Sequence, residues 1–225
     1  MWNEILFTAQ SILISIFAIG SILLGQGCLY AFTAVCWIFG NFYVLKEVSI
    51  LGLNVITTDS FAIGANMGIM LIQEYYGKKA AERSIFVGVY MSLFFLAISQ
   101  LLVMYTPNVH DTCHLHFAFL IARMPRIVIG SIFVALFTMF LNLKLFDIFT
   151  KKLGQGSFYL ASISALMIAQ FIDVVLFVFI ALWGNVTSIT DIILFSYLIK
   201  CISIMIVVPC VSLCKKFIPS GSSSF

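Results

Sequence analysis

The chain has 225 residues, of which 62% are hydrophobic and only 9% are charged, and its formal net charge is +3. A soluble domain typically carries about 25% charged residues, so the polar surface that a soluble protein needs is absent here. The length suits one integral membrane domain of six or seven spans, because each membrane-spanning helix needs about 20 residues.

Apolar runs along the chain predict seven membrane-spanning helices, and hence an all-α fold that forms a polytopic membrane helix bundle. The first run is interpreted as a retained helix and not as a signal peptide, because Glu4 is its only early charge and no clear cleavage site follows. Near Gly25 the first two runs could instead join into one long kinked segment. The runs cover residues 4–24, 27–45, 54–76, 82–105, 121–143, 157–182 and 192–214.

Basic residues predict the orientation of these spans. Eight of the 12 lysines and arginines follow odd-numbered spans, and loops rich in such residues stay in the cytoplasm. We therefore expect the N-terminus outside and the C-terminus inside, which agrees with an odd number of spans. The basic residues form no stripe that would bind nucleic acid directly. The eight residues are Lys78, Lys79, Arg83, Lys144, Lys151, Lys152, Lys215 and Lys216.

The run 54–76 carries a polar stripe on an otherwise apolar helix. Asp59, Asn66 and Gln73 are seven residues apart, a spacing that returns to nearly the same helical face, and Glu74 follows directly. Asp59 could equally be an N-terminal helix residue that the macrodipole favours, and Glu74 could be a boundary charge. The stripe therefore predicts either a buried polar face or a set of helix-end residues.

The last two runs place opposite charges deep in apolar sequence. Gln170 and Asp173 share one helical face, and Lys200 lies well inside the final span. A charge at the centre of a membrane helix costs roughly 2.5–3.5 kcal/mol on insertion scales, so Asp173 needs a partner, a water-filled cavity or a ligand. Lys200 could neutralise it in a purely structural ion pair. Aromatic side chains nearby could supply stacking surface: Phe171, Phe177 and Trp183.

Other residues in or near the spans have mainly structural interpretations. Asn41 could satisfy a helix end, and Arg126, which opens the fifth span together with Arg123, could extend to the membrane interface. Gly64 and Gly68 are spaced as GxxxG, a pattern whose usual meaning is close approach of another helix.

The chemistry-bearing motifs of enzymes are absent from the sequence. There is no P-loop, HExxH or GxSxG motif, so we expect neither an enzyme nor ATP hydrolysis by this chain. The six cysteines include no CxxC pair. The segment 106–117 holds His110, Asp111, Cys113, His114 and His116 without a known metal-ligand spacing, and we interpret this group as incidental. No metal or other cofactor is expected.

Five stretches carry a resemblance to a known family. They are FGNFYVLKEVSILGLN (39–54), QEYYGKKAAERSI (73–85), FAFLIARMPRIVIGS (117–131), ISALMIAQFIDVVLFVFIALWG (163–184) and LIKCISIMIVVP (198–209). Together they resemble the queuosine precursor transporters, bacterial inner-membrane proteins also called putative vitamin uptake transporters. The resemblance implies uptake of 7-deazaguanine compounds, namely pre-queuosine bases or queuine, which are used to modify the tRNA wobble position.

The resemblance also implies a domain organisation. The core, residues 25–216, is expected to be similar to the six-helix substrate-binding subunits of energy-coupling vitamin transporters. Residues 1–24 form an additional N-terminal membrane helix, and residues 217–225 form a disordered tail. The partners implied are the 7-deazaguanine substrate and the lipid bilayer, with a homodimer left open.

Site residues carried over from the family are expected to bind the substrate. The carboxylate of Asp173 or Glu74 suits the N1–H and 2-amino edge of a 7-deazaguanine, and Gln170 or Arg123 could donate to its O6. Many relatives have an aspartate where this chain has Met70, and Asn66 or Gln73 is the expected replacement. The substrate-binding residues implied are Asn41, Asn66, Gln73, Glu74, Arg123, Gln170, Asp173 and Lys200.

Three functions remain open from the sequence. The favoured one is a transporter that imports a queuosine precursor by itself. The second is a substrate-binding subunit that depends on a separate ATPase module, or a transporter of another small polar heterocycle. The third is a structural membrane protein in which the buried charges form only an ion pair.

Overall fold

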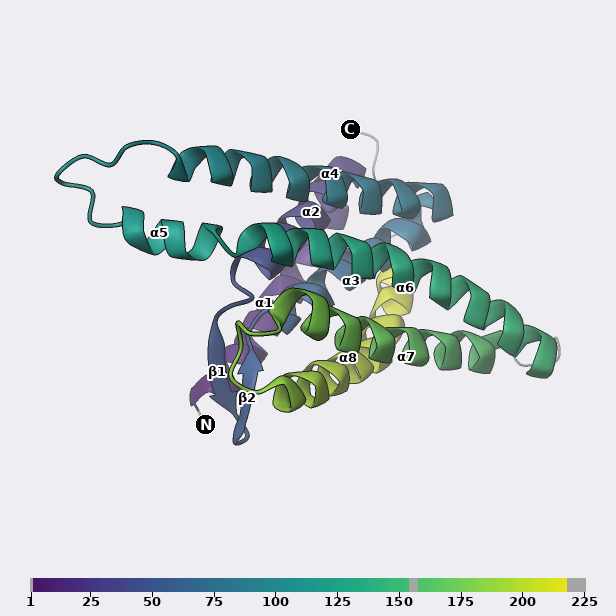
Figure 1. Ribbon diagram of the computed structural model, residues 1–225. Helices are drawn as coiled ribbons and strands as arrows, with labels where there is room; N and C mark the ends of the chain where they lie inside the picture. Colours follow the sequence, from purple (N-terminus) through teal and green to yellow (C-terminus); the bar gives the residue numbers. More distant parts are fainter. Residues whose placement is uncertain (1, 154–157, 218–225) are drawn as a thin grey trace.

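The computed structural model describes residues 2–153 and 158–217 and confirms an all-α membrane helix bundle (Figure 1). A small β-hairpin joins α2 to α3, and α7 continues into one turn of π-helix, η2 (Val178–Leu182). The other elements are α1 (Trp2–Leu23), α2 (Gln26–Phe42), β1 (Glu47–Ile50), β2 (Leu53–Ile56), α3 (Asp59–Tyr76), α4 (Lys78–Val103), α5 (His114–Ile121), α6 (Met124–Leu153), α7 (Phe158–Phe177) and α8 (Ile189–Phe217).

Each of the seven apolar runs of the sequence overlaps one long helix, although α4, α6 and α8 extend beyond their runs. Gly25 separates α1 from α2 with a φ of 92°, a backbone conformation that glycine adopts readily, so the alternative of a single kinked segment is wrong. The third run was expected to begin at residue 54, but β2 occupies residues 53–56 and α3 begins only at Asp59. Of the expected C-terminal tail, Phe217 ends α8, and the remainder lies outside the described residues.

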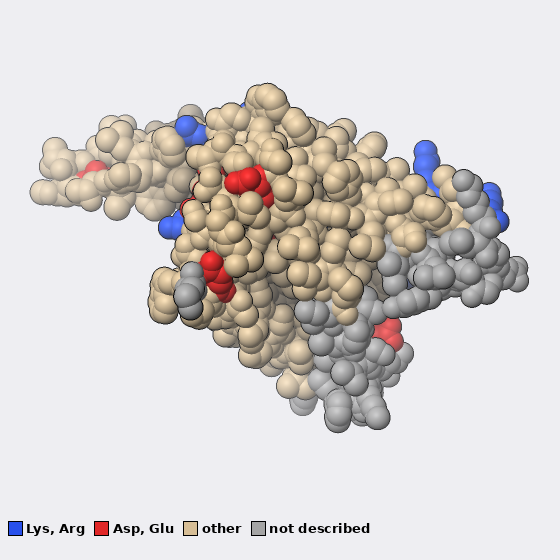
Figure 2. Space-filling model, turned by 90° about the horizontal axis from the view of Figure 1, so that it is seen from below, with Lys and Arg blue, Asp and Glu red and all other residues tan. Residues whose placement is uncertain are grey.

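Among the described residues, four helical stretches are long and apolar enough to cross a membrane by length and composition alone. The 17 residues of α2 are fewer than a full span needs, and α3 is made less apolar by its polar stripe. The face drawn in Figure 2 carries few charged side chains, as expected for a surface that meets lipid. The four stretches are Trp2–Leu23, Lys78–Val103, His114–Asn142 and Ser164–Leu182.

The helices form two groups, and α3 lies at the centre of the first. It packs against α1, α2 and α4, while α6, α7 and α8 form the second group, and α3 meets α8 between them. The expected GxxxG packing is confirmed. A Cβ added to Gly64 would lie 2.3 Å from Cγ2 of Ile14 on α1, and one added to Gly68 would lie 2.4 Å from Cγ2 of Thr33 on α2.

The hairpin between α2 and α3 is held to the helices by carboxylates. Its strands are antiparallel, and the turn at Leu51 and Gly52 has positive φ at both residues, as tight hairpin turns require. Glu4 of α1 accepts the backbone N–H of Leu51 at 3.1 Å, and Asp191 of α8 accepts that of Asn54 at 3.0 Å. These contacts fix the hairpin over the ends of α1 and α8.

The segment between α4 and α5 extends away from the bundle (Figure 1). The carboxylate of Asp111 accepts the backbone N–H groups of Cys113 and His114, each at 3.0 Å, and so satisfies donors at the start of α5. Asp111 therefore has a structural role in this segment. No group of His, Cys, Asp and Glu suited to hold a metal ion occurs among the described residues.

Candidate functional site

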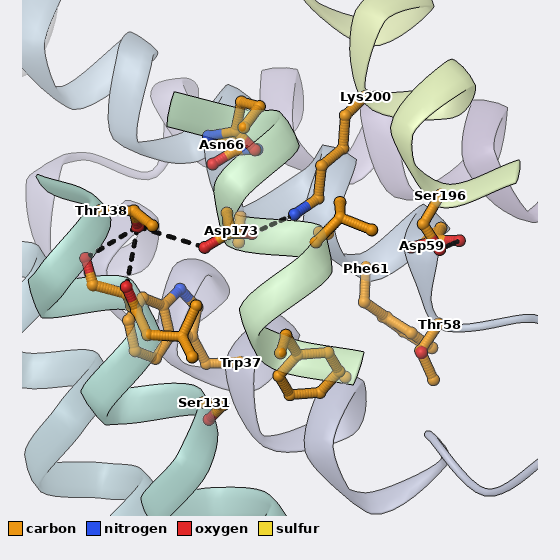
Figure 3. Close-up of a pocket in the computed structure, with 18 of the residues that line it drawn as sticks. Trp37, Thr58, Asp59, Phe61, Asn66, Ser131, Thr138, Asp173, Ser196 and Lys200 are labelled. Atoms are coloured by element: carbon orange, nitrogen blue, oxygen red, sulfur yellow. Dashed lines mark hydrogen bonds and ion pairs between the residues drawn. The ribbon is translucent and has the colours of Figure 1, made fainter. Parts of the chain in front are cut away.

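A cavity of about 310 Å³ lies between the two helix groups (Figure 3). This volume falls in the range of small-molecule sites, and most of the lining is apolar with a few polar groups, which is typical of such sites. Thr58, directly before α3, is one of the polar lining residues, and the others come from five helices: Asn41 of α2, Asp59 and Asn66 of α3, Ser131, Thr138 and Asn142 of α6, Gln170 and Asp173 of α7, and Ser196 and Lys200 of α8.

The ion pair inferred from the sequence is present in this cavity. The ammonium group of Lys200 donates to Oδ2 of Asp173, and both side chains are largely buried, 14% and 19% exposed. Thr138 Oγ1 lies 3.2 Å from Asp173 Oδ1 and 2.8 Å from the Val134 carbonyl oxygen. Asp173 is thus held between α6 and α8, on the wall that also carries Gln170.

A second carboxylate, that of Asp59, lines the same cavity. Asp59 is only 5% exposed, and the hydroxyl of Ser196 donates to its Oδ2 at 2.7 Å. It lies in the first turn of α3, where the helix macrodipole favours a negative charge. The helix-end interpretation of Asp59 and its place at the cavity are therefore both consistent with the structure.

Carboxamide groups supply most of the remaining polarity. Asn41 donates from Nδ2 to the Trp37 carbonyl oxygen at 3.0 Å, which agrees with the interpretation that it satisfies a helix end. Asn142 Oδ1 is buried at the cavity and has no hydrogen-bond partner in the described part of the chain. A buried acceptor without a partner is costly, so this atom indicates that a water molecule or a ligand reaches the cavity.

The aromatic lining differs from the sequence expectation. Of the three aromatic residues expected, only Phe177 lines the cavity. Phe171 instead packs edge-on against Tyr197, and Trp183 is 53% exposed and stacks on Phe179. The stacking surface comes mainly from the other helix group, where Trp37 of α2 and Phe61 of α3 face the cavity (Figure 3).

Three of the expected site residues lie outside the cavity lining. Gln73 and Glu74 are exposed near the end of α3. Arg123 donates to Asn185 Oδ1 at 3.1 Å and to the Phe119 carbonyl oxygen at 2.9 Å, and its guanidinium lies 3.8 Å above the Phe119 ring. The other five do line the cavity: Asn41, Asn66, Gln170, Asp173 and Lys200.

Several lining residues were not singled out from the sequence. Ser131, Thr138 and Asn142 are seven and four residues apart, so they share one face of α6, and this periodicity is the signal that could have identified them. Ser196 precedes Lys200 by four residues on α8 and faces the same cavity. No pattern in the sequence pointed to Trp37 or Phe61, because aromatic residues are common throughout the chain.

Buried apolar side chains line the cavity on the side of the hairpin. Val44, Ile56, Val174 and Val178 line the cavity and belong to a buried cluster that we call the hairpin-side cluster. Arg126 stabilises this end, because it donates to the carbonyl oxygens of Ile180 at 2.7 Å and Trp183 at 2.8 Å around η2. The cluster comprises Val44, Ile56, Ile127, Val174, Val178, Ala181, Leu182 and Ile192.

On the opposite side the cavity adjoins a groove between α4 and α6. The groove has a volume of about 220 Å³ and is lined by Glu82, Ile85, Phe86, Leu136 and Met139. Ile85 and Met139 also line the main cavity, so these two side chains separate the spaces.

A comparison with protein families matches residues 66–214 to the model described as putative vitamin uptake transporter. The matched range begins within α3 and ends within α8, so it includes Asn66, Gln170, Asp173 and Lys200. Asn41 and Asp59 lie before it. No curated protein and no solved structure gives a significant match to this chain.

Proposed function

Because this chain belongs to the family of putative vitamin uptake transporters, we propose that it imports a 7-deazaguanine base, a pre-queuosine base or queuine, for the modification of tRNA. The observation that carries the proposal is the cavity in which Gln170, Asp173 and Lys200 meet between the two helix groups. Charged residues within membrane segments are expensive, and those facing a cavity commonly mark a substrate pathway.

The cavity offers the groups that a guanine-like ring requires. A carboxylate accepts two N–H bonds, so Asp173 can accept from the N1–H and 2-amino edge of the base. Gln170, three residues away on the same helix, can donate from its amide to O6. Trp37, Phe61 and Phe177 supply aromatic surface against which a planar ring can stack.

The ion pair gives a mechanism for exchanging the empty and loaded states. Without substrate, Lys200 neutralises Asp173, so neither charge is left unpaired. When a base donates to Asp173, the Lys200 ammonium can turn to O6 of the same base and keep its charge satisfied. Both charged groups therefore keep a hydrogen-bond partner in the empty and the loaded state, which lowers the cost of admitting a polar solute.

The packing on the hairpin side of the cavity and the adjoining groove support release of the substrate on the side of the groove. The buried hairpin-side cluster packs at one end of the cavity, whereas Ile85 and Met139 line both the cavity and the groove. With the orientation predicted from the basic residues, the hairpin side faces outward and the groove faces the cytoplasm. The structure would then correspond to a state that releases substrate inward.

The test is restoration of queuosine in tRNA. The chain is expressed in a bacterium that cannot make the precursors, lacks its own transporter and has the matching tRNA-modifying enzyme. One base at a time is supplied at low concentration: either pre-queuosine base, or queuine. We expect modification with at least one base and none with the empty vector.

Two negative outcomes of this experiment have different meanings. No modification with any base, despite confirmed membrane expression, contradicts autonomous import of queuosine precursors. Modification only when a separate ATPase module is co-expressed would identify the chain as a partner-dependent binding subunit.

A further inference from the structure

The cavity is lined by more negatively charged than positively charged side chains. Its charged lining residues are the carboxylates of Asp59 and Asp173 and the ammonium of Lys200. Lys200 forms its ion pair with Asp173. Within the described residues, the side chain of Asp59 receives a hydrogen bond only from the neutral hydroxyl of Ser196. Among the described residues, Asp59 therefore forms no ion pair of its own, and Lys200, the nearest cation named at the cavity, is bonded to the other carboxylate.

The helix end at Asp59 compensates its charge only in part. A helix N-terminus acts as roughly +0.5 of an elementary charge, so the first turn of α3 offsets only part of a full negative charge on Asp59. Asp59 is 5% exposed, and bulk water therefore screens little of the negative charge that the helix end does not offset. A cationic group on the bound molecule would complete the balance.

The two carboxylates are placed so that one ligand can reach both. Ser196 and Lys200 are one helical turn apart on the same face of α8, and residues at this spacing have Cβ atoms ~5–6 Å apart. Ser196 contacts Asp59 of α3, and Lys200 contacts Asp173 of α7 (Figure 3). A bicyclic base whose hydrogen-bonding edge meets Asp173 can therefore direct a substituent toward Asp59.

We propose that Asp59 is a specificity-determining residue that binds a cationic amine on the substrate, so that the protein selects 7-deazaguanine bases with an aliphatic amine over neutral ones. This inference rests on the proposed function. It assigns Asp173 and Gln170 to the ring shared by all these bases and Asp59 to the substituent that distinguishes them. Phe61, two residues after Asp59, lines the cavity beside it.

The experiment compares two bases that differ only in the substituent, 7-aminomethyl-7-deazaguanine and 7-cyano-7-deazaguanine. Uptake of each is measured in the host described above, for the wild-type protein and for Asp59→Asn and Asp59→Glu. We expect the wild type to reach half-maximal uptake of the aminomethyl base at a concentration at least tenfold lower than that of the cyano base. Asp59→Asn should lose this preference, because its half-maximal concentration should rise more for the aminomethyl base than for the cyano base, and Asp59→Glu should retain the preference.

The outcomes separate this inference from the proposed function. Uptake of both bases by the wild type with equal half-maximal concentrations overturns the role of Asp59 and leaves the proposed function intact. An equal loss of both bases in Asp59→Asn at normal expression also overturns it. No uptake of either base or of queuine by the wild type contradicts the proposed function itself. The wild-type comparison can overturn the inference even if Asp59→Asn fails to fold, and Asp59→Glu then tests the role of Asp59.

Discussion

At the scale of single residues, the Lys200–Asp173 pair is either a purely structural ion pair or part of the substrate site, and the two explanations predict different effects of substitutions. Removing one partner of a buried ion pair is strongly destabilising, by about 3–5 kcal/mol, because the other charge is left uncompensated. Replacing both partners by neutral residues is often tolerated. A single substitution therefore cannot separate a structural pair from a substrate site, whereas removal of both charges can.

We expect Asp173→Asn and Lys200→Met to abolish uptake and to lower the amount of folded protein. The double variant Asp173→Asn/Lys200→Met should recover folding, because no charge remains unpaired, but it should not recover uptake. Folding is measured by size-exclusion chromatography in detergent, and uptake by queuosine in tRNA. Asp111→Asn, which keeps the Oδ1 acceptor at the start of α5, is the matched control and should behave as wild type. Full uptake by the double variant would show that the pair is structural, and full uptake by Asp173→Asn at normal expression would show that the Asp173 carboxylate does not bind the substrate.

At the scale of elements, close packing of α3 depends on two glycines. Gly64 faces Ile14 of α1, and Gly68 faces Thr33 of α2, which is 1% exposed and is branched at Cβ. A membrane bundle gains little from the hydrophobic effect between helices, so this close contact is a main source of its stability. A side chain at either position must displace a neighbouring helix.

We expect Gly68→Val to destabilise the protein by about 1–3 kcal/mol, the usual effect of overpacking a core. The measurement is the midpoint of thermal unfolding in detergent, which should fall relative to wild type. Gly20→Ala on α1 is the control, since no atom lies within 4 Å of the Cβ that it would add. If Gly68→Val and Gly20→Ala unfold at the same temperature, the packing role of Gly68 is wrong.

Two of the elements that the sequence did not predict, the hairpin and the turn η2, are short and are stabilised by contacts remote in the chain. Apolar runs predicted all seven long helices, because burial in lipid selects long runs of apolar residues. The hairpin was assigned partly to helices, since each strand has only four residues and depends on Glu4 and Asp191. The turn η2 likewise depends on Arg126, 54 residues away from Ile180. Contacts of this kind leave no local pattern.

At the scale of the whole molecule, the candidate site is formed by residues from both helix groups. The sequence predicted Gln170, Asp173 and Lys200, because a polar residue in an apolar run is conspicuous. It did not predict which boundary residues reach the cavity: Glu74 and Arg123 lie outside the lining, and Asp59 lies within it. That distinction depends on how far each helix extends and which way it turns, and both are set by tertiary packing.

The orientation of the whole molecule is the remaining prediction, and a natural cysteine allows it to be tested. Cys113 is exposed in the segment between α4 and α5, which should be outside, and Lys79 is exposed at the start of α4, which should be in the cytoplasm. In spheroplasts, a membrane-impermeant maleimide should label Cys113 of the wild type and give no such label in Cys113→Ser. In Lys79→Cys/Cys113→Ser, labelling should require permeabilised membranes. The reverse pattern would place the N-terminus inside and the hairpin side of the cavity toward the cytoplasm, and the direction of transport inferred from the hairpin-side cluster would then be wrong.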